Sequence, residues 1–254
     1  MLYFVPLASS QSEYGSSTPE LWDDLSSDYE EAVFSLLQFA DVRQKILSSL
    51  TQGNVLDMGC GPVPTLLQEI QKNEGIRLFG SDFSRGMLAA NRKHFPNGGV
   101  HFVQADHRQL PFAGESFHSV FSVNSILPEE RIDIDRTLSE VHRVLQPGGR
   151  FVAFLPAFET SLLARDVWKI PILVDEEQHR EFDSGSWQCF FSRDDVIHLM
   201  QRYSFTIREL EQFTLASDEA IKRIQRIYGE DITQQLLTQH PLFEHFLVAQ
   251  KADL

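Results

Sequence analysis

Hydrophobic and polar positions change their rhythm near residue 54, where short apolar runs begin to alternate with longer polar and apolar stretches. Five runs predict β-strands: Asn54–Met58, Ile76–Ser81, Val100–Gln104, Ser119–Val123 and Arg150–Leu155. The stretches between them predict three helices: Thr65–Lys72, Arg85–His94 and Ile132–Gln146. The sequence QPGG that follows is expected to end the last helix, because glycine accepts the left-handed conformation of a helix end. Strands that alternate with helices form a parallel sheet, which binds ligands at the carboxyl ends of its strands.

The segments on either side of this alternation are predicted to be additions to the sheet. Residues 21–49 predict two helices that precede it. The stretch between Leu155 and Phe191 is irregular and too long for a plain loop, which indicates a cap. Ser192–Asp195 carries the capping-box pattern that opens a helix. Two closing strands are then expected at Phe205–Leu215 and Phe243–Ala252, separated by a helix with apolar positions at Ile221, Ile224, Ile227 and Tyr228.

Charge and cysteine content narrow the classes of partner. The 254-residue chain has 36 acidic against 22 basic residues and a formal net charge of −14, which repels polyphosphate, so no nucleic-acid partner is expected. No apolar run approaches the roughly 18–20 residues of a membrane span, and no membrane partner is expected. Two cysteines exclude a disulfide framework, and the N-terminal MLYFVPLASS lacks the basic residues of a signal peptide. The expected location is therefore the cytoplasm.

The stretch NVLDMGCGPVPTLL, residues 54–67, carries the clearest candidate chemistry. An apolar strand ends at Asp57, the glycines at 59 and 61 make a turn, and a helix follows. Such a turn lets backbone N–H groups approach a ligand, with a helix N-terminus aimed at a negative group. Two cofactors use turns of this kind. A nicotinamide dinucleotide needs a third small residue where Pro64 stands, so S-adenosylmethionine fits the sequence better.

Three later segments, together with this turn, resemble the class I S-adenosylmethionine-dependent methyltransferases of the small-molecule type. LFGSDFSRGML (78–88) is similar to the family's second strand, which ends in an acid followed by S-x-x-M-L. QADHRQLPF (104–112) resembles the A-D-x-x-x-L-P-F block, and LSEVHRVLQPGG (138–149) resembles the E-x-x-R-V-L-K-P-G-G segment. The four motifs occur in the family's order and spacing between residues 54 and 156.

The resemblance implies a fold and a division of the chain. The fold class is α/β, with a Rossmann-like seven-stranded sheet of order 3-2-1-4-5-7-6, the last strand antiparallel, and helical cap insertions. Residues 1–50 are expected to form an N-terminal helical cap or lid. Residues 51–254 are expected to form the methyltransferase domain, with cap insertions at about 157–191 and 216–242.

The resemblance also implies how the cofactor is held. Asp57 would help to hold the ammonium of the methionine part, and Asp82 would accept hydrogen bonds from both ribose hydroxyls. Asp106 would accept from the adenine amine, and Tyr29 with Trp22 would fold over the cofactor as a lid. The cofactor-binding set is Tyr29, Asp57, Gly59, Cys60, Gly61, Asp82, Phe83, Met87, Asp106, His107, Asn124 and Ser125.

Two positions depart from the family's pattern. Val63 stands where a third glycine is frequent, and its branched side chain limits how closely the helix start can approach the methionine part. His118 replaces the usual Asp after "SF", and we interpret it as a structural change on a strand.

The catalytic residues are not assigned by the sequence. His107, His179 and Glu181 are candidate general bases, although a backbone role is favoured for the first. Cys60 is expected to be a small filler, because methyl transfer from a sulfonium needs no enzyme nucleophile. The acids of DEEQHREFD (175–183) could attract a divalent cation, but a solvated loop is favoured and no metal is expected.

Two further groups of side chains leave alternatives open. Trp168, Trp187, Phe190 and Phe191 could wall an acceptor pocket or belong to an ordinary core. Lys222, Arg223 and Arg226 could meet a phosphate or an acidic carrier protein, although a solvated face is favoured.

The sequence thus predicts direct methyl transfer from S-adenosylmethionine to a small-molecule or carrier-bound acceptor, with S-adenosylhomocysteine as product. The acidic charge and the sequence NSIL after the fourth strand argue against a nucleic-acid acceptor. The alternative is a protein that binds S-adenosylmethionine without transferring its methyl group. The oligomeric state is left open.

Overall fold

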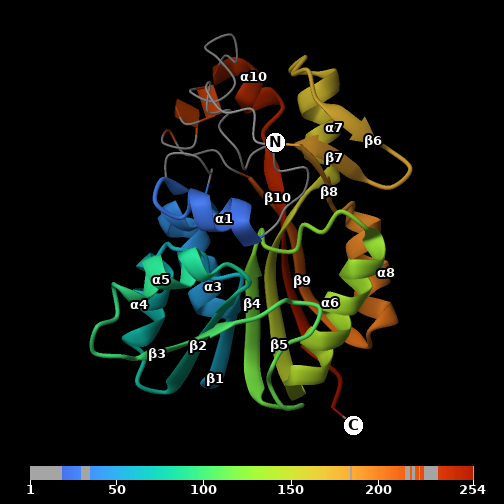
Figure 1. The fold of residues 1–254 in the computed structure, drawn as a ribbon. Helices are drawn as coiled ribbons and strands as arrows, with labels where there is room; N and C mark the ends of the chain where they lie inside the picture. The colour runs from blue at the N-terminus through green and yellow to red at the C-terminus, as the bar shows by residue number, and fades with distance from the viewer. Residues whose placement is uncertain are drawn as a thin grey trace.

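The computed structural model describes residues 19–29, 35–183, 185–214, 218, 221–222, 224–225 and 234–253. Its centre is a seven-stranded sheet that stands upright in Figure 1. The strands of this sheet are β1 (Gly53–Met58), β2 (Ile76–Asp82), β3 (Val100–Gln104), β4 (Phe117–Val123), β5 (Leu145–Pro156), β9 (Phe205–Thr214) and β10 (Phe243–Lys251).

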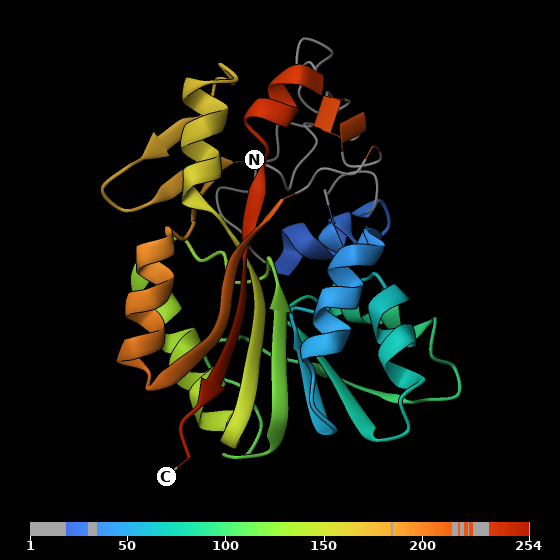
Figure 2. The same cartoon turned by 180° about the vertical axis from the view of Figure 1, so that it is seen from behind.

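The strand order is β3-β2-β1-β4-β5-β10-β9. The pairs from β3 through β5 are parallel, and β10 is antiparallel to both of its neighbours, β5 and β9. Figure 2 shows β10 running between these two strands. Because β9 and β10 are the sixth and seventh strands of this sheet along the chain, the predicted order 3-2-1-4-5-7-6 with an antiparallel last strand is confirmed.

Helices cover both faces of the sheet, and each face has its own hydrophobic core. The helices α3 (Ala40–Ser49), α4 (Thr65–Gln71) and α5 (Arg85–Arg92) pack into one core. The helices α6 (Arg131–Val144) and α8 (Arg193–Arg202) pack into the other. Consecutive residues of β1, Val55 and Leu56, are both fully buried and belong to different cores. Because successive side chains of a strand point to opposite faces, burial on both faces explains why the strands are continuous apolar runs.

The end of α6 is the clearest difference from the predicted boundaries. The helix ends at Val144, two residues before the expected end, and Leu145 is already extended. Leu145 is fully buried and pairs with Phe117 of β4, so tertiary pairing starts β5 earlier than the predicted Arg150. The left-handed residue of QPGG is Gly148 (φ 71°), which lies within the irregular first part of β5 instead of at the helix end.

The insertion after β5 contains a helix and a small sheet, where the sequence had suggested helices. It comprises α7 (Phe158–Asp166) and the antiparallel strands β6 (Leu173–Asp175), β7 (Arg180–Asp183) and β8 (Ser186–Cys189). Gly185, with φ of 92°, supplies the left-handed residue of the turn between β7 and β8. Figure 1 shows these elements gathered at the end of the main sheet where its parallel strands finish.

The N-terminal elements are α1 (Pro19–Leu25) and a single 3₁₀ turn, η1 (Leu36–Gln38). Helix α1 docks on the start of α5 through Asp23, whose Oδ1 accepts hydrogen bonds from Ser84 Oγ (2.5 Å) and the Gly86 N–H (2.7 Å). A Cβ atom at Gly86 would lie 2.9 Å from the Cα of Asp23, so glycine is needed for this packing. The short helix α10 (Gln234–Gln239) precedes β10.

Several predictions fall outside the described residues. They include the irregular start over residues 1–18, Arg223 and Arg226 of the basic face, and Ile227 and Tyr228 of the inserted helix. Of the same helix, Ile224 is fully buried and Lys222 is exposed. Over the described ranges, no helix is both long enough and apolar enough to cross a membrane.

Candidate functional site

The turn after β1 ties two strand ends together. The N–H groups of Gly59 and Cys60 both donate to the carbonyl oxygen of Ser81, at 2.8 and 2.9 Å. The N–H of Gly61 donates to Asp82 Oδ2 at 3.0 Å. In this structure these three N–H groups hold the end of β2 and do not point into open space.

The glycines are needed for shape. Gly59 and Gly61 have φ of 82° and 53°, in the left-handed region that favours glycine. A Cβ atom on Gly59 would lie 2.2 Å from the Cβ of Ser125, far inside contact distance. The Ser125 hydroxyl itself donates to the carbonyl oxygen of Met58 (2.6 Å), so the ends of β1 and β4 are pinned side by side. A Cβ atom on Gly61 would meet only the hydroxyl oxygen of Tyr29, at 4.0 Å, so the turn leaves room at that point.

Two buried carboxylates flank this turn. Asp57 is 3 % exposed and Asp82 is 6 % exposed. Burial, reinforced by the charge of Asp82, raises the pKa of Asp57 well above its usual range. Burial raises the pKa of Asp82 to about 6, although hydrogen bonds from the N–H groups of Ser84 and Gly61 oppose the shift. A pair of buried acids favours a cationic ligand and disfavours an anionic pyrophosphate.

The carboxylate of Asp82 keeps hydrogen-bonding capacity for a ligand. Oδ2 accepts the Gly61 N–H and Oδ1 accepts the Ser84 N–H, each at 3.0 Å. An ionised carboxylate has about four acceptor positions, so each oxygen can accept one more hydrogen bond. Two vicinal hydroxyls of a ribose would match this arrangement.

A cavity of about 400 Å³ opens beside the turn, a size suited to a small-molecule ligand. Its wall includes ten of the twelve predicted cofactor residues: Tyr29, Gly59, Gly61, Asp82, Phe83, Met87, Asp106, His107, Asn124 and Ser125. Asp57 does not line this cavity, and Cys60 lines only a neighbouring smaller pocket. The buried Asp57 is nevertheless close enough for its charge to raise the pKa of Tyr29.

The distal wall of the cavity is polar. Arg108 Nε donates to both carboxylate oxygens of Asp106, each at 3.0 Å, and its Nη1 donates to Asp133 at 2.9 Å. The hydrogen bonds from Arg108 lower the pKa of Asp106. Asp106 was expected to accept a hydrogen bond from the adenine amine. In the structure its carboxylate already accepts hydrogen bonds from Arg108, so a hydrogen bond to a ligand must use its remaining acceptor positions.

His107 lies against the glycine turn. Its Cε1 is 3.2 Å from the position that a Cβ of Gly59 would take. Burial lowers the pKa of this imidazole to about 4, so the ring is neutral at pH 7. Its Nε2 is buried and has no hydrogen-bond partner among the described residues. A group with so low a pKa is a weak general base but a suitable hydrogen-bonding group for a ligand.

The N-terminal segment covers the turn. Tyr29 and Trp22 line the cavity, and their rings lie 6.4 Å apart between centroids. Burial, together with the charges of Asp82 and Asp57, raises the pKa of the Tyr29 phenol, so the phenol is neutral.

The other two candidate bases lie in the cap and do not line the cavity. His179 Nδ1 lies 2.6 Å from Asp195 Oδ2, and its ring stacks on Phe158. Glu181 is buried on β7. The described residues contain no group of three or more His, Cys, Asp or Glu side chains placed to hold a metal ion.

The cap aromatics and His118 have structural surroundings in this arrangement, whereas Val63 also reaches a pocket. Trp168, Phe190 and Phe191 are buried in the cores, and none of the four predicted aromatics lines the cavity. His118 Nδ1 accepts the backbone N–H of Asn54 at 3.1 Å. Val63 is buried in a core and also lines the smaller pocket.

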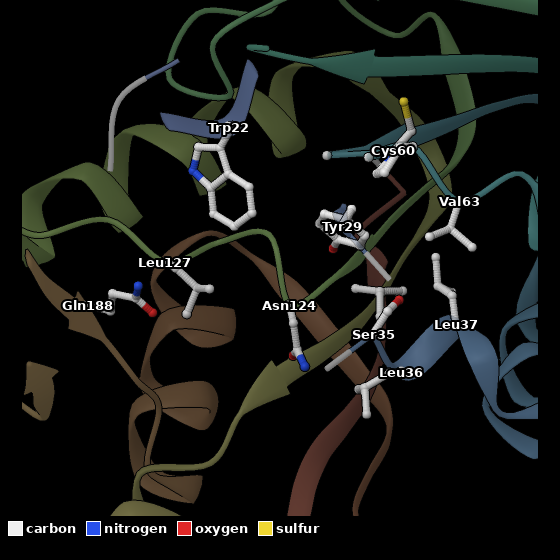
Figure 3. Close-up of a pocket in the computed structure, with 14 residues that line it drawn as sticks. Trp22, Tyr29, Ser35, Leu36, Leu37, Cys60, Val63, Asn124, Leu127 and Gln188 are labelled. Atoms are coloured by element: carbon white, nitrogen blue, oxygen red, sulfur yellow. The ribbon is translucent and has the colours of Figure 1, made fainter. Parts of the chain in front are cut away.

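Part of the site carries no signal in the sequence. The lining of the smaller pocket, drawn in Figure 3, includes Leu36 and Leu37 of η1, Leu127, and Gln188 of the cap. These residues lie far apart along the chain and carry no shared motif. Only burial of the polar Gln188 side chain, at 3 % exposure, sets it apart, and burial is a property of the folded chain.

Comparison with known proteins agrees with this geometry. A family described as "Methyltransferase domain" matches residues 55–149. The ubiquinone/menaquinone biosynthesis C-methyltransferase UbiE of Desulfotalea psychrophila is 29% identical over 181 residues, which cover 65% of this chain and 70% of the relative. A malonyl-(acyl-carrier protein) O-methyltransferase of Salmonella typhimurium is 25% identical over 205 residues, covering 80% and 74% of the two chains. Two further relatives, 32% and 36% identical, are matched over only 29% and 37% of their own lengths.

The fold is also found in solved structures. An S-adenosylmethionine-dependent methyltransferase from Mesorhizobium loti superposes with a TM-score of 0.60 at 20% identity, over 83% of this chain and 96% of its own. The structure shows the strand order and the glycine turn between two buried acids. The sequence match to a methyltransferase domain covers this turn and both acids. Residues 55–149 thus match a methyltransferase domain in sequence, and most of the chain is similar in fold to an S-adenosylmethionine-dependent methyltransferase.

Proposed function

We propose that this chain transfers the methyl group of S-adenosylmethionine to a small-molecule or carrier-bound acceptor by direct displacement. The observation that carries the proposal is the pair of buried acids, Asp57 and Asp82, on either side of a turn whose N–H groups are already used. Without a cationic ligand these two carboxylates repel each other in a low-dielectric setting. A ligand that carries an ammonium and a sulfonium group offsets the negative charge of both carboxylates.

The proposed roles follow the geometry of the cavity. Asp82 accepts the ribose hydroxyls with the acceptor positions that Gly61 and Ser84 leave unused. Asp57 acts through its charge, or through a bridging water, on the methionine ammonium. Met87, 1 % exposed at the start of α5, offers an apolar and polarizable surface to the adenine.

Four more residues complete the proposed binding set. Phe83 faces the same cavity as Met87 and would contact the adenine. Asp106 and His107 offer hydrogen bonds at the adenine end, and Asn124 and Ser125 lie where β4 ends, beside the methionine part.

The cofactor supplies an activated methyl group, so the protein mainly has to position the acceptor and exclude water. Tyr29 and Trp22 cover the turn from the N-terminal side. The smaller pocket shares Asn124 and Leu127 with the larger cavity and lies between the turn and the cap, where an acceptor can meet the cofactor. No base is assigned: His107 is too weakly basic, and the two other candidates lie outside the cavity.

The relatives support a small-molecule or carrier-bound acceptor, since their names refer to quinone biosynthesis and to a malonyl-carrier protein. We also propose a cytoplasmic location, which agrees with two buried and unbridged cysteines.

Calorimetric titration with S-adenosylmethionine, S-adenosylhomocysteine and NAD tests the cofactor part of this proposal. Binding of the first two and not of NAD is expected. Asp82→Asn should weaken that binding by about 100-fold or more, as expected for losing hydrogen bonds to a charged acceptor. Asp194→Asn, an exposed position on α8, is the matched control and should bind as the parent does. Binding of NAD alone would refute the assignment.

Turnover separates the proposed function from its alternative. Methyl transfer from isotopically labelled S-adenosylmethionine to acceptors of the quinol and carrier-bound classes should produce S-adenosylhomocysteine in equal amount. Tight binding of the cofactor with no transfer to any acceptor would favour a protein that binds S-adenosylmethionine without methyl transfer.

A further inference from the structure

The smaller pocket of Figure 3 continues the cofactor cavity toward the cap. It shares Tyr29, Gly59, Gly61 and Asn124 with that cavity and has a volume of about 50 Å³. A single water needs roughly 10–15 Å³ measured in the same way, so the pocket accepts a small group of heavy atoms. What occupies it would lie directly beside the site of the methyl group, if the proposed function holds.

Gln188 enters this pocket from the cap as a buried polar side chain. It is 3 % exposed, and its Oε1 has no hydrogen-bond partner within the described part of the chain. Two hydrogen bonds fix its strand: the backbone N–H of Cys189 donates to the carbonyl oxygen of Pro128 at 2.9 Å, and the side-chain Nη1 of Arg180, on the neighbouring β7, donates to the carbonyl oxygen of Glu129 at 3.3 Å. Strand β8 is therefore fastened to the loop after β4, and Gln188 is held against the pocket.

Asn124 brings a second unpaired carboxamide. Its Oδ1 and Nδ2 are both buried and lack a partner among the residues described. Its backbone is left-handed (φ 49°), and its N–H donates to the carbonyl of Phe154 at 3.0 Å. The end of β4 is thus held in a conformation that is unusual for a residue with a side chain. Figure 3 shows Asn124 and Gln188 on either side of Leu127.

Leaving buried polar atoms unpaired costs stability, so two such side chains in one pocket indicate a ligand that pairs them. The remaining described lining is apolar or neutral. Leu36, Leu37, Val63 and Leu127 form apolar walls, and the described lining residues carry no charge at pH 7. Burial raises the pKa of the Cys60 thiol and the Tyr29 phenol, which keeps both neutral.

We propose that this pocket binds the head of an uncharged, apolar acceptor that carries a hydroxyl group. Gln188 Oε1 accepts a hydrogen bond from the hydroxyl group, and Asn124 Nδ2 donates a hydrogen bond to the hydroxyl oxygen. Gln188 is then a specificity-determining residue that contacts the acceptor and not the cofactor. Anionic and cationic acceptors would find no opposite charge in the described lining, and an ether of the same shape would leave Gln188 unpaired.

Ligand-observed NMR on the protein saturated with S-adenosylhomocysteine tests this inference with four small probes: para-cresol, para-methylanisole, para-toluate and para-methylbenzylammonium. Para-cresol should bind best, and its methyl ether about tenfold more weakly, as expected for one lost hydrogen bond. Gln188→Leu should weaken the binding of para-cresol by a similar factor and leave the binding of the ether unchanged. Gln178→Leu, an exposed position in the same cap, is the matched control. Equal binding of para-cresol by Gln188→Leu and the parent, or preference for a charged probe, would overturn the proposal.

Two measurements keep this test separate from folding and from the proposed function. Gln188→Leu should retain the parent's affinity for S-adenosylhomocysteine, because Gln188 does not line the larger cavity. Its thermal midpoint should stay equal or rise, since the substitution removes an unpaired buried polar group. A lowered midpoint together with lost para-cresol binding would mean a structural role and would contradict the inference. Failure of the parent chain to bind S-adenosylhomocysteine would instead refute the proposed function.

Discussion

Asp82 should make the ligand-free protein less stable at neutral pH than at mildly acidic pH. Burial raises the pKa of this carboxyl from 3.8 to about 6 in the folded state. Between these two pH values the unfolded chain has lost the proton while the folded chain keeps it, so stability falls as pH rises. The full loss, complete above pH 6, is about 3 kcal/mol at roughly 1.4 kcal/mol for each tenfold change in the proton equilibrium. About 1.3 kcal/mol of it should appear between pH 5 and pH 7.

Asp82→Asn isolates this contribution, because asparagine has no proton to gain or lose. Urea unfolding of the parent and the variant at pH 5 and pH 7, without ligand, gives the free energy of unfolding of each. The variant loses one of the two backbone hydrogen bonds that Asp82 accepts from Gly61 and Ser84, and this cost is the same at both pH values. Relative to the parent, the variant should therefore gain about 1.3 kcal/mol on going from pH 5 to pH 7. The variant also lacks the Asp82 charge that helps to raise the pKa of the neighbouring Asp57, and this changes the stability difference in the same direction.

An unchanged difference between variant and parent at the two pH values would refute the reasoning. It would mean that Asp82 is ionised in the folded protein at pH 5, as an exposed carboxyl is, and that burial does not control its proton. Saturation with S-adenosylhomocysteine, which carries an ammonium, should reduce the pH dependence of the parent, because binding a cation favours the ionised carboxylate.

Other predictions follow from the same geometry. Gly59→Ala should lower stability by about 3 kcal/mol and abolish cofactor binding, since its Cβ would lie 2.2 Å from a Ser125 atom. Gly98→Ala, with nearly the same φ of 81° but open space around it, should cost only about 1 kcal/mol by thermal or urea unfolding. Asp23→Asn should weaken cofactor binding about tenfold in calorimetry by loosening α1 from α5, whereas the exposed Asp28→Asn should not. The affinity of the parent for S-adenosylhomocysteine should fall below about pH 6, where Asp82 takes up a proton.

Local pattern determined the elements and their order. The central strands β1 and β4 are apolar runs buried on both faces. Strand β3, at the edge of the sheet, was predicted at the observed Val100–Gln104. The family resemblance added the strand order and the acids at the ends of β1 and β2. These features could be predicted because the strand periodicity and the D-x-G-x-G and S-D motifs are local in the sequence.

The tertiary structure decided which groups are available for binding. The N–H groups of the glycine turn are used by Ser81 and Asp82, residues more than 20 positions away, which no local motif discloses. The α6 helix ended early because Leu145 pairs with Phe117, a residue 28 positions earlier in the chain.

The strands could be located from the sequence because periodicity is local to each element, whereas their order in the sheet and the roles of the two acids came only from the family resemblance of the motifs. The charge states of Asp57, Asp82 and His107, and the entry of Gln188 into the smaller pocket, arise only in the folded chain. Burial sets all of these, and burial arises when segments distant in the chain, such as β8 and the loop after β4, come together.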